Sequence, residues 1–157
     1  MKRKVFIMIL VLSLLSIGCD INSHEYPNIS KKPNINYYTS KLASDIETTD
    51  NYTVVLLETN LTKELAVNKE DKDTIINFFC SLEEENFIPN HDKPKSPPKF
   101  KFFIKLSGSR YIIDVYDEEI ISIYPWDGIY SEDFITMKNI PKAYNLYGLS
   151  QYILQNY

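Results

Sequence analysis

Alternation of apolar and polar residues is clearest in the C-terminal half of the chain, where it predicts three successive β-strands. In the first strand, residues 100–106, the apolar positions fall on one face: Phe100, Phe102, Ile104 and Leu106. Residues 110–116 and 119–124 alternate in the same way. The connections at 107–109 and 117–118 are short, so we expect neighbouring strands to pair antiparallel.

Two earlier runs also predict strands. Residues 52–58 are rich in β-branched and aromatic side chains, and a turn at Thr59-Asn60 separates them from a second run at 63–67. A short extended segment is expected at 134–137, after the turn residues Pro125 and Asp127-Gly128.

A spacing of three and four residues predicts two helices. Asn68 is a candidate N-cap for the first, whose apolar face is expected to hold Ile75, Ile76, Phe79 and Leu82. The second helix is expected to begin at Pro141 and end near Gln155, with Leu146, Leu149 and Ile153 facing the core. The predicted fold class is therefore α+β: an antiparallel sheet meander of about five strands with two helices packed on one face.

The first nineteen residues have the composition of an export signal. Three basic residues, Lys2 to Lys4, precede the apolar run Val5 to Ile17, which is too short to span a bilayer comfortably. Ser16-Ile17-Gly18-Cys19 resembles the bacterial lipobox, although Ser16 stands where leucine is usual. We expect residues 1–18 to be a lipoprotein signal peptide and Cys19 to carry the lipid, palmitate included. An ordinary secretory signal or an uncleaved membrane anchor remains the alternative.

Residues 19–39 are polar and contain Pro27 and Pro33, a composition typical of a flexible tether. Residues 40–157 are expected to form a single α+β domain. The expected location is the extracellular face of the cell membrane, with the N-terminal lipid as the contact to the membrane.

The charge of the chain argues against nucleic acid as a partner. Removal of Lys2, Arg3 and Lys4 with the signal peptide moves the formal net charge from −4 to −7. The one basic cluster, Lys93 to Lys99, lies in a proline-rich loop without interleaved aromatics. If Cys19 is acylated, Cys80 has no partner for an internal disulfide, and its apolar surroundings predict a small core residue.

No catalytic residue, metal site or cofactor is predicted. The chain has two histidines, His24 in the expected tether and His91 in the proline-rich loop, so neither has fixed partners for acid–base catalysis. Turn chemistry could gather an acidic cluster of Asp117 to Glu119, Asp127, Glu132 and Asp133 at one end of the sheet. Its spacing matches no calcium-binding loop, and exposed acidic turns are usually solvated.

The most distinctive segment is an aromatic turn, residues 124–130, which contains the single tryptophan of the chain. Aromatic side chains on a rigid turn make binding hot spots. The candidate binding residues are Tyr124, Trp126, Asp127 and Tyr130. The same aromatic residues are also well suited to close the open end of a small core, which is the more common role of such residues, and this alternative stays open.

Several segments together resemble a family of uncharacterised clostridial lipoproteins. They are residues 100–104, 111–115, the Ile121 to Gly128 segment, Glu132-Asp133, and Ile140 to Tyr147. The most specific parts are the Trp-Asp-Gly turn and the Pro-x-x-Tyr-Asn-Leu segment. The resemblance extends from the lipobox to the C-terminus. It implies anchoring to a Gram-positive membrane and no known activity.

These observations favour a non-enzymatic binding or accessory domain at the cell surface, whose ligand is an unknown protein, peptide or cell-wall component. One alternative is an extracellular hydrolase that uses acidic residues near the turn, Asp127 and Asp133. Another is an inhibitor that blocks a secreted enzyme with the Lys93 to Lys99 loop.

Overall fold

The computed structural model describes residues 31–49, 51–89 and 91–156. The chain divides into two compact units, residues 1–31 and 32–157, and the fold described below is that of the second. The expected signal peptide, Cys19 and most of the expected tether lie outside the described residues.

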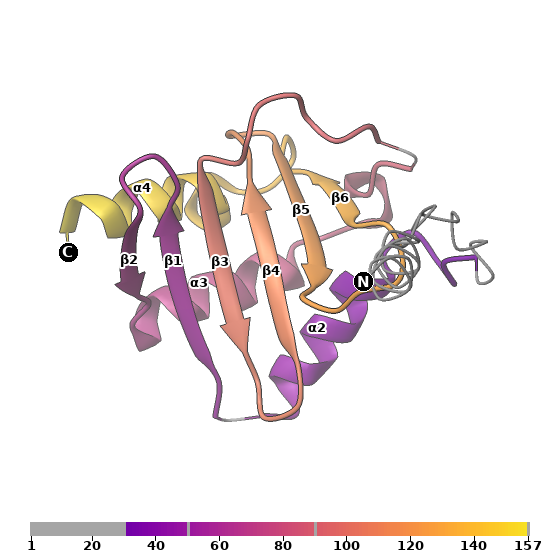
Figure 1. Ribbon diagram of the computed structural model, residues 1–157, viewed down its shortest axis with the longest axis horizontal. Helices are drawn as coiled ribbons and strands as arrows, with labels where there is room; N and C mark the ends of the chain where they lie inside the picture. Colours follow the sequence, from indigo (N-terminus) through magenta and orange to yellow (C-terminus); the bar gives the residue numbers. More distant parts are fainter. Residues whose placement is uncertain (1–30, 50, 90, 157) are drawn as a thin grey trace, which may run out of the picture. The chain divides into compact units, whose positions relative to one another are not determined.

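Within the described residues, six strands form one antiparallel sheet in the order β2-β1-β3-β4-β5-β6 (Figure 1). The strands are β1 (Thr53–Glu58), β2 (Lys63–Ala66), β3 (Phe100–Lys105), β4 (Arg110–Val115), β5 (Ile120–Pro125) and β6 (Asp133–Thr136). Strands β3 to β6 form a meander, as the alternation predicted. Strand β3 returns to pair with β1, so that the β1–β2 hairpin extends the same sheet.

The helices α2 (Tyr37–Glu47), α3 (Lys69–Cys80) and α4 (Leu146–Asn156) cover one face of the sheet (Figure 1). Two short 3-10 helices, η1 (Glu84–Asn86) and η2 (Lys142–Tyr144), complete the order of elements. The buried core lies between the helices and the sheet face that carries Leu56, Phe102 and Ile113. The α+β class, the antiparallel meander and the packing of helices on one face are thus confirmed.

Two counts differ from the sequence-based expectation. The described sheet has six strands rather than about five, because the short segment before Met137 pairs with β5 as β6. The described residues also contain a third α-helix, α2, which begins at Tyr37 inside the segment 19–39 that was expected to be a tether. Its buried side chains recur at intervals of four: Tyr38, Leu42 and Ile46.

The ends of the other two helices follow from their caps. The Asn68 side chain accepts a hydrogen bond from the Asp71 backbone N–H at 2.8 Å, which confirms Asn68 as the N-cap of α3. Helix α4 begins at Leu146 rather than at Pro141, since Asn145 Oδ1 accepts from the N–H groups of Tyr147 and Gly148. Pro141 instead precedes η2.

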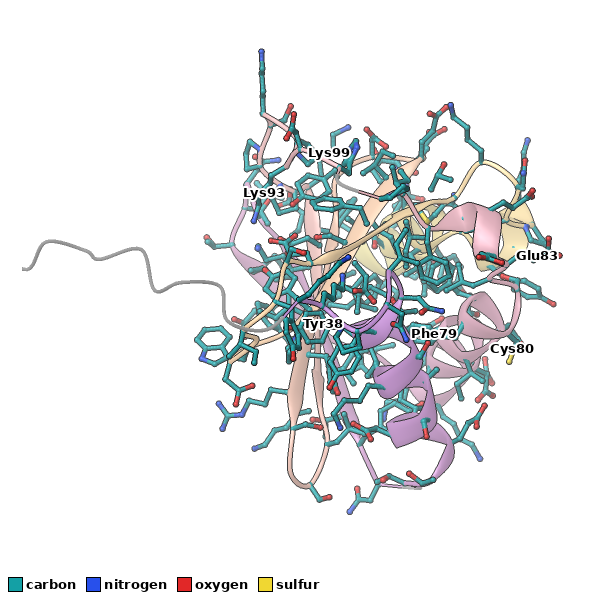
Figure 2. All side chains as sticks on the ribbon, turned by 90° about the vertical axis from the view of Figure 1, so that its right-hand side faces the viewer. Tyr38, Phe79, Cys80, Glu83, Lys93 and Lys99 are labelled. Carbon is teal, nitrogen blue, oxygen red and sulfur yellow. The ribbon has the colours of Figure 1, made fainter. Side chains whose placement is uncertain are left out.

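The face that α3 turns to the core is rotated slightly from the predicted one. Ile75 and Phe78 are fully buried, whereas Phe79 is only partly covered. Cys80, expected in the core, is exposed at the end of the helix (Figure 2). Among the described residues, no helix is long and apolar enough to cross a membrane.

Candidate functional site

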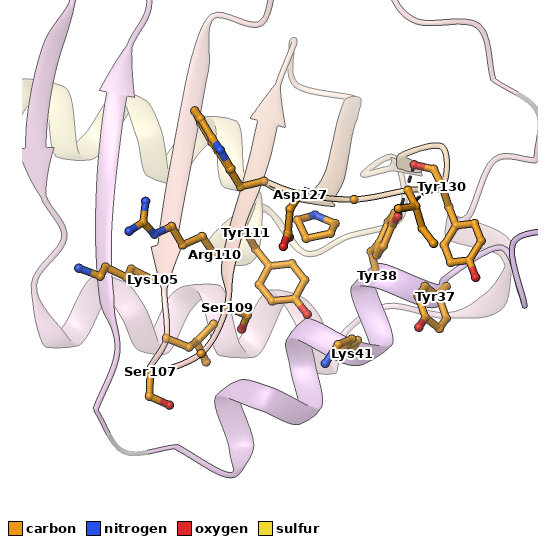
Figure 3. Close-up of a pocket in the computed structure, with 16 residues that line it drawn as sticks. Tyr37, Tyr38, Lys41, Lys105, Ser107, Ser109, Arg110, Tyr111, Asp127 and Tyr130 are labelled. Atoms are coloured by element: carbon orange, nitrogen blue, oxygen red, sulfur yellow. Dashed lines mark hydrogen bonds between the residues drawn. The ribbon is translucent and has the colours of Figure 1, made fainter. Parts of the chain in front are cut away.

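A hollow of about 760 Å³ opens at one end of the sheet (Figure 3). Three segments line it: the first turns of α2, the β3–β4 turn at 107–109, and the aromatic turn that follows β5. These segments are far apart in the sequence, so the site exists only in the folded domain.

The position of α2 depends on one buried carboxylate, Asp133, whose side chain is 0% exposed. Its Oδ2 accepts hydrogen bonds from the Thr39 N–H at 2.7 Å and from Thr39 Oγ1 at 2.8 Å. Lys32 Nζ lies 2.5 Å from its Oδ1. Because Asp133 satisfies a free N–H in the first turn of α2, it acts as the N-cap that the helix lacks locally.

The aromatic turn is fixed against α2 by a glycine. Gly128 N–H donates to Pro125 O at 3.1 Å and closes the turn, while Tyr38 Oη accepts from Tyr130 N–H at 2.8 Å. A Cβ atom on Gly128 would lie 2.9 Å from Tyr38 Oη, which is closer than such contacts occur. Glycine therefore permits the close approach of the turn to the helix.

Aromatic rings form much of the wall. Tyr37 packs edge-on against Tyr130 with ring centroids 5.5 Å apart, and Tyr38 lies beside both. Trp126 is 69% exposed. Its indole therefore does not plug the core, and its surface is available to a ligand.

Tyr111 contributes a neutral hydroxyl beneath the hollow. Burial raises the pKa of its phenol, and the negative charge of Asp45 raises that pKa further. The protonated phenol donates to Asp45 Oδ2 at 3.2 Å. Lys41 also lies near this carboxylate, at 3.5 Å.

Two basic side chains, Lys105 and Arg110, stand directly opposite each other on β3 and β4 (Figure 3). Both are exposed. In the part of the chain that the structure describes, neither side chain has an ion-pair or hydrogen-bond partner. Like charges directly opposite on a sheet repel each other, so this arrangement costs stability.

A second hollow of about 310 Å³ adjoins the first on the sheet face away from the helices. Its floor contains Val55, Phe103 and Ile112. The residues shared by the two hollows are Lys105, Arg110, Tyr111 and Trp126. The two hollows therefore form one continuous surface around Trp126.

The structure brings three of the four predicted binding residues together, since Trp126, Asp127 and Tyr130 all line the first hollow. Tyr124 does not. Its hydroxyl donates to Asp114 Oδ2 at 3.1 Å, and Lys93 lies over its ring. Sequence reasoning missed the lining residues Tyr37, Lys41, Lys105 and Arg110. The Lys105–Arg110 pair could have been found, because both residues flank the predicted hairpin turn.

Four acidic residues of the predicted cluster are engaged in separate contacts: Asp117, Glu119, Glu132 and Asp133. Asp133 caps α2, and Glu132 accepts from Ser122 Oγ and pairs with Lys93 at 2.8 Å. Asp117 accepts from two backbone N–H groups of its own turn. Among the described residues, no group of three or more His, Cys, Asp or Glu side chains is placed to hold a metal ion. Asp127 is the one carboxylate in the described part of the chain that lines the first hollow.

The proline-rich loop is fastened to the domain. Besides the Lys93–Glu132 pair, Lys99 lies 5.2 Å from the centre of the Tyr147 ring, and Thr59 Oγ1 donates to Pro98 O at 2.7 Å. The two ends of the loop are thus held by contacts within the chain, whereas residues 95–97 are exposed.

Comparison with known proteins places the chain among relatives without an assigned activity. A family profile described as a domain of unknown function, DUF4883, matches residues 32–150. The fold is similar to a crystal structure described as a candidate lipoprotein from Clostridium perfringens. That similarity has a TM-score of 0.73 and 33% sequence identity over 80% of this chain and 100% of the other. No match to a curated protein was found. The resemblance to uncharacterised clostridial lipoproteins is thereby confirmed.

Proposed function

Because the chain belongs to the DUF4883 family of unknown function, we propose its role from the site: it is a lipid-anchored surface lipoprotein that binds a ligand in the hollow around Trp126. The anchor is the lipid on Cys19, and the domain acts on the extracellular face of the cell membrane. Binding, not catalysis, is the proposed activity.

Two independent observations support the anchor. The sequence before residue 20 combines basic residues, a short apolar run and a cysteine after glycine, as lipoprotein signals do. The clostridial neighbour, whose whole chain is covered, is itself described as a candidate lipoprotein.

The exposure of Trp126 is the observation that carries the binding proposal. An indole that is 69% exposed contributes little to the core, yet the backbone around it is firmly held. Trp126 N–H donates to Arg110 O at 2.9 Å, and the next turn residues are fixed by Tyr38. A large aromatic side chain on a fixed backbone loses little conformational entropy on binding, which is how binding hot spots act.

A hydrolase receives less support from the same geometry. General acid–base hydrolysis by carboxylates requires a second carboxyl group facing the first across the substrate. Of the acidic residues that the structure describes, Asp127 alone lines the first hollow, while Asp133 is buried under α2 and hydrogen-bonded.

The proposal is tested by capture from the native cell surface. Full-length protein and the Trp126→Ala variant are expressed in the source bacterium, crosslinked and purified, and the co-purified material is compared. Tyr152→Ala serves as the matched control, because Tyr152 is an exposed aromatic residue on α4, outside the hollow.

We expect Trp126→Ala to reduce capture about tenfold, equivalent to the loss of a hot-spot residue of roughly 1.4 kcal/mol. The melting temperature of the variant should stay within about 2 °C of the parent. Capture that is equal for the parent and both variants would exclude the hollow as the binding site.

A further inference from the structure

The hollow has a charge opposite to that of the chain. The whole chain has a formal net charge of −4, but the charged residues lining the hollow, among those that the structure describes, are Lys41, Lys105, Arg110 and a single acid, Asp127. Lys41 is partly neutralised by Asp45, whereas Lys105 and Arg110 have no acidic partner among the described residues. The fold therefore keeps two adjacent cations unpaired at this surface.

An anion placed between Lys105 and Arg110 would relieve their mutual repulsion. Arginine and lysine together suit either a carboxylate or a phosphate, since the guanidinium offers a fork of donors and the ammonium a point charge. The pair is held in register by the β3–β4 ladder, so it is preorganised for such a group.

The remaining lining groups suit a saccharide. Trp126 offers an exposed aromatic surface on which the C–H face of a sugar ring can stack. The Asp127 carboxylate and the hydroxyls of Ser107 and Ser109 can accept hydrogen bonds from sugar hydroxyls. An acidic peptide has fewer hydroxyls to offer to these acceptors.

The topology also disfavours an extended peptide. Peptides commonly bind sheets by adding a strand to a free edge. Strands β3 and β4 beside the hollow are internal strands paired on both sides, and β5 pairs with β4 along its length and with β6 from Ile120 to Ile123. The free edges belong to β2 and β6.

From these observations we propose that the ligand is an extended, negatively charged glycan. A carboxylate or phosphate of one unit binds Lys105 and Arg110, a neighbouring ring stacks on Trp126, and the chain continues over the apolar floor of the second hollow. This inference rests on the proposed binding function and specifies its ligand class.

The test measures binding of the full chain, purified in detergent, to four probes by isothermal titration calorimetry at low salt. The probes are polygalacturonate oligomers for carboxylate, a phosphodiester-linked hexose polymer for phosphodiester, dextran as a neutral glycan, and polyglutamate as an acidic peptide. The variant Lys105→Gln/Arg110→Gln is compared with Lys63→Gln/Lys142→Gln, which removes two exposed cations outside the hollow.

We expect at least one of the two anionic glycans to bind. Its affinity should fall at least tenfold in Lys105→Gln/Arg110→Gln and in Trp126→Ala, and less than twofold in the control, with all variants folded by circular dichroism. The anionic glycan that binds identifies the acidic group.

Failure of the anionic glycans, equal binding of dextran, or a preference for polyglutamate would overturn the ligand class. If Trp126-dependent capture from the cell surface survives under any of those results, the proposed binding function stands and only the ligand class is wrong. If surface capture fails as well, the binding function itself is wrong.

Discussion

A single buried carboxylate organises the site at the scale of residues. Asp133 holds the first turn of α2 through Thr39 and pairs with Lys32. Helix α2 in turn supplies Tyr37, whose ring lines the hollow, and Tyr38, whose hydroxyl fixes the aromatic turn. Asp127, only six positions earlier, is exposed in the hollow. Two acidic residues that the sequence groups together thus have different roles: Asp133 is structural, and Asp127 is available to a ligand.

Asp133→Ala is expected to destabilise the domain by about 3 kcal/mol, because it leaves the Lys32 ammonium and the Thr39 N–H without their partner. Asp127→Ala should change the free energy of unfolding by less than about 0.5 kcal/mol, as is usual for an exposed residue. Urea unfolding of both variants measures the difference. Equal stability of the two would show that Asp133 does not hold α2.

At the scale of elements, the β3–β4 hairpin sets the charge of the site. The register places Lys105 opposite Arg110, and the unpaired cations stand beside Trp126. An element optimised for stability alone would carry opposite charges at these positions. We infer that the hairpin keeps Lys105 and Arg110 opposite each other, despite their repulsion, because the two charges bind a ligand.

Lys105→Glu is therefore expected to stabilise the domain by about 0.2–1 kcal/mol, since it converts a repulsive cross-strand pair into an attractive one. The same substitution should weaken anionic glycan binding at least tenfold. Thermal unfolding and calorimetry on one preparation test both effects. A fall in stability would mean that Lys105 has a structural role in the hairpin.

Some of the strands and helices could be predicted from the sequence, and others could not. Strands β3 to β5 were predicted because each alternates clearly and short turns link them. Helix α2 was not predicted, although Tyr38, Leu42 and Ile46 have helical spacing. Its local N-cap residue, Asn36, makes no side-chain cap. The cap comes instead from Asp133, which lies 94 residues from Thr39 in the sequence.

The candidate site could likewise be predicted only in part from the sequence. Trp126, Asp127 and Tyr130 lie close together in the sequence, and the structure keeps them together in the hollow. Tyr37 and Lys41 come from the helix that the sequence did not reveal. Cys80 was misplaced because an apolar run does not show which side of its helix faces the core.

At the scale of the whole molecule, the proposed lipid anchor would hold a small binding domain at the membrane surface. Residues 32–157 form one compact unit, and the sequence before it has the composition of an export signal and spacer. A lipid at Cys19 would confine the domain to the membrane surface, where confinement raises its effective concentration toward a ligand held at the same surface.

Cys19→Ala is expected to abolish lipid attachment, and globomycin, which blocks lipoprotein signal peptidase, should make the unprocessed form accumulate. Metabolic labelling with palmitate measures the first effect, and the size of the protein on a denaturing gel measures the second. Unchanged labelling of Cys19→Ala together with unchanged processing under globomycin would contradict the anchor.

The central claim, that the hollow around Trp126 binds a cell-surface ligand, has a direct optical test because Trp126 is the single tryptophan of the chain. Its fluorescence is recorded as solubilised cell-wall material from the source bacterium is added to full-length protein. The account predicts a saturable blue shift of the emission, since binding covers an indole that is 69% exposed. An emission spectrum that stays constant while the same material demonstrably binds the protein would contradict it.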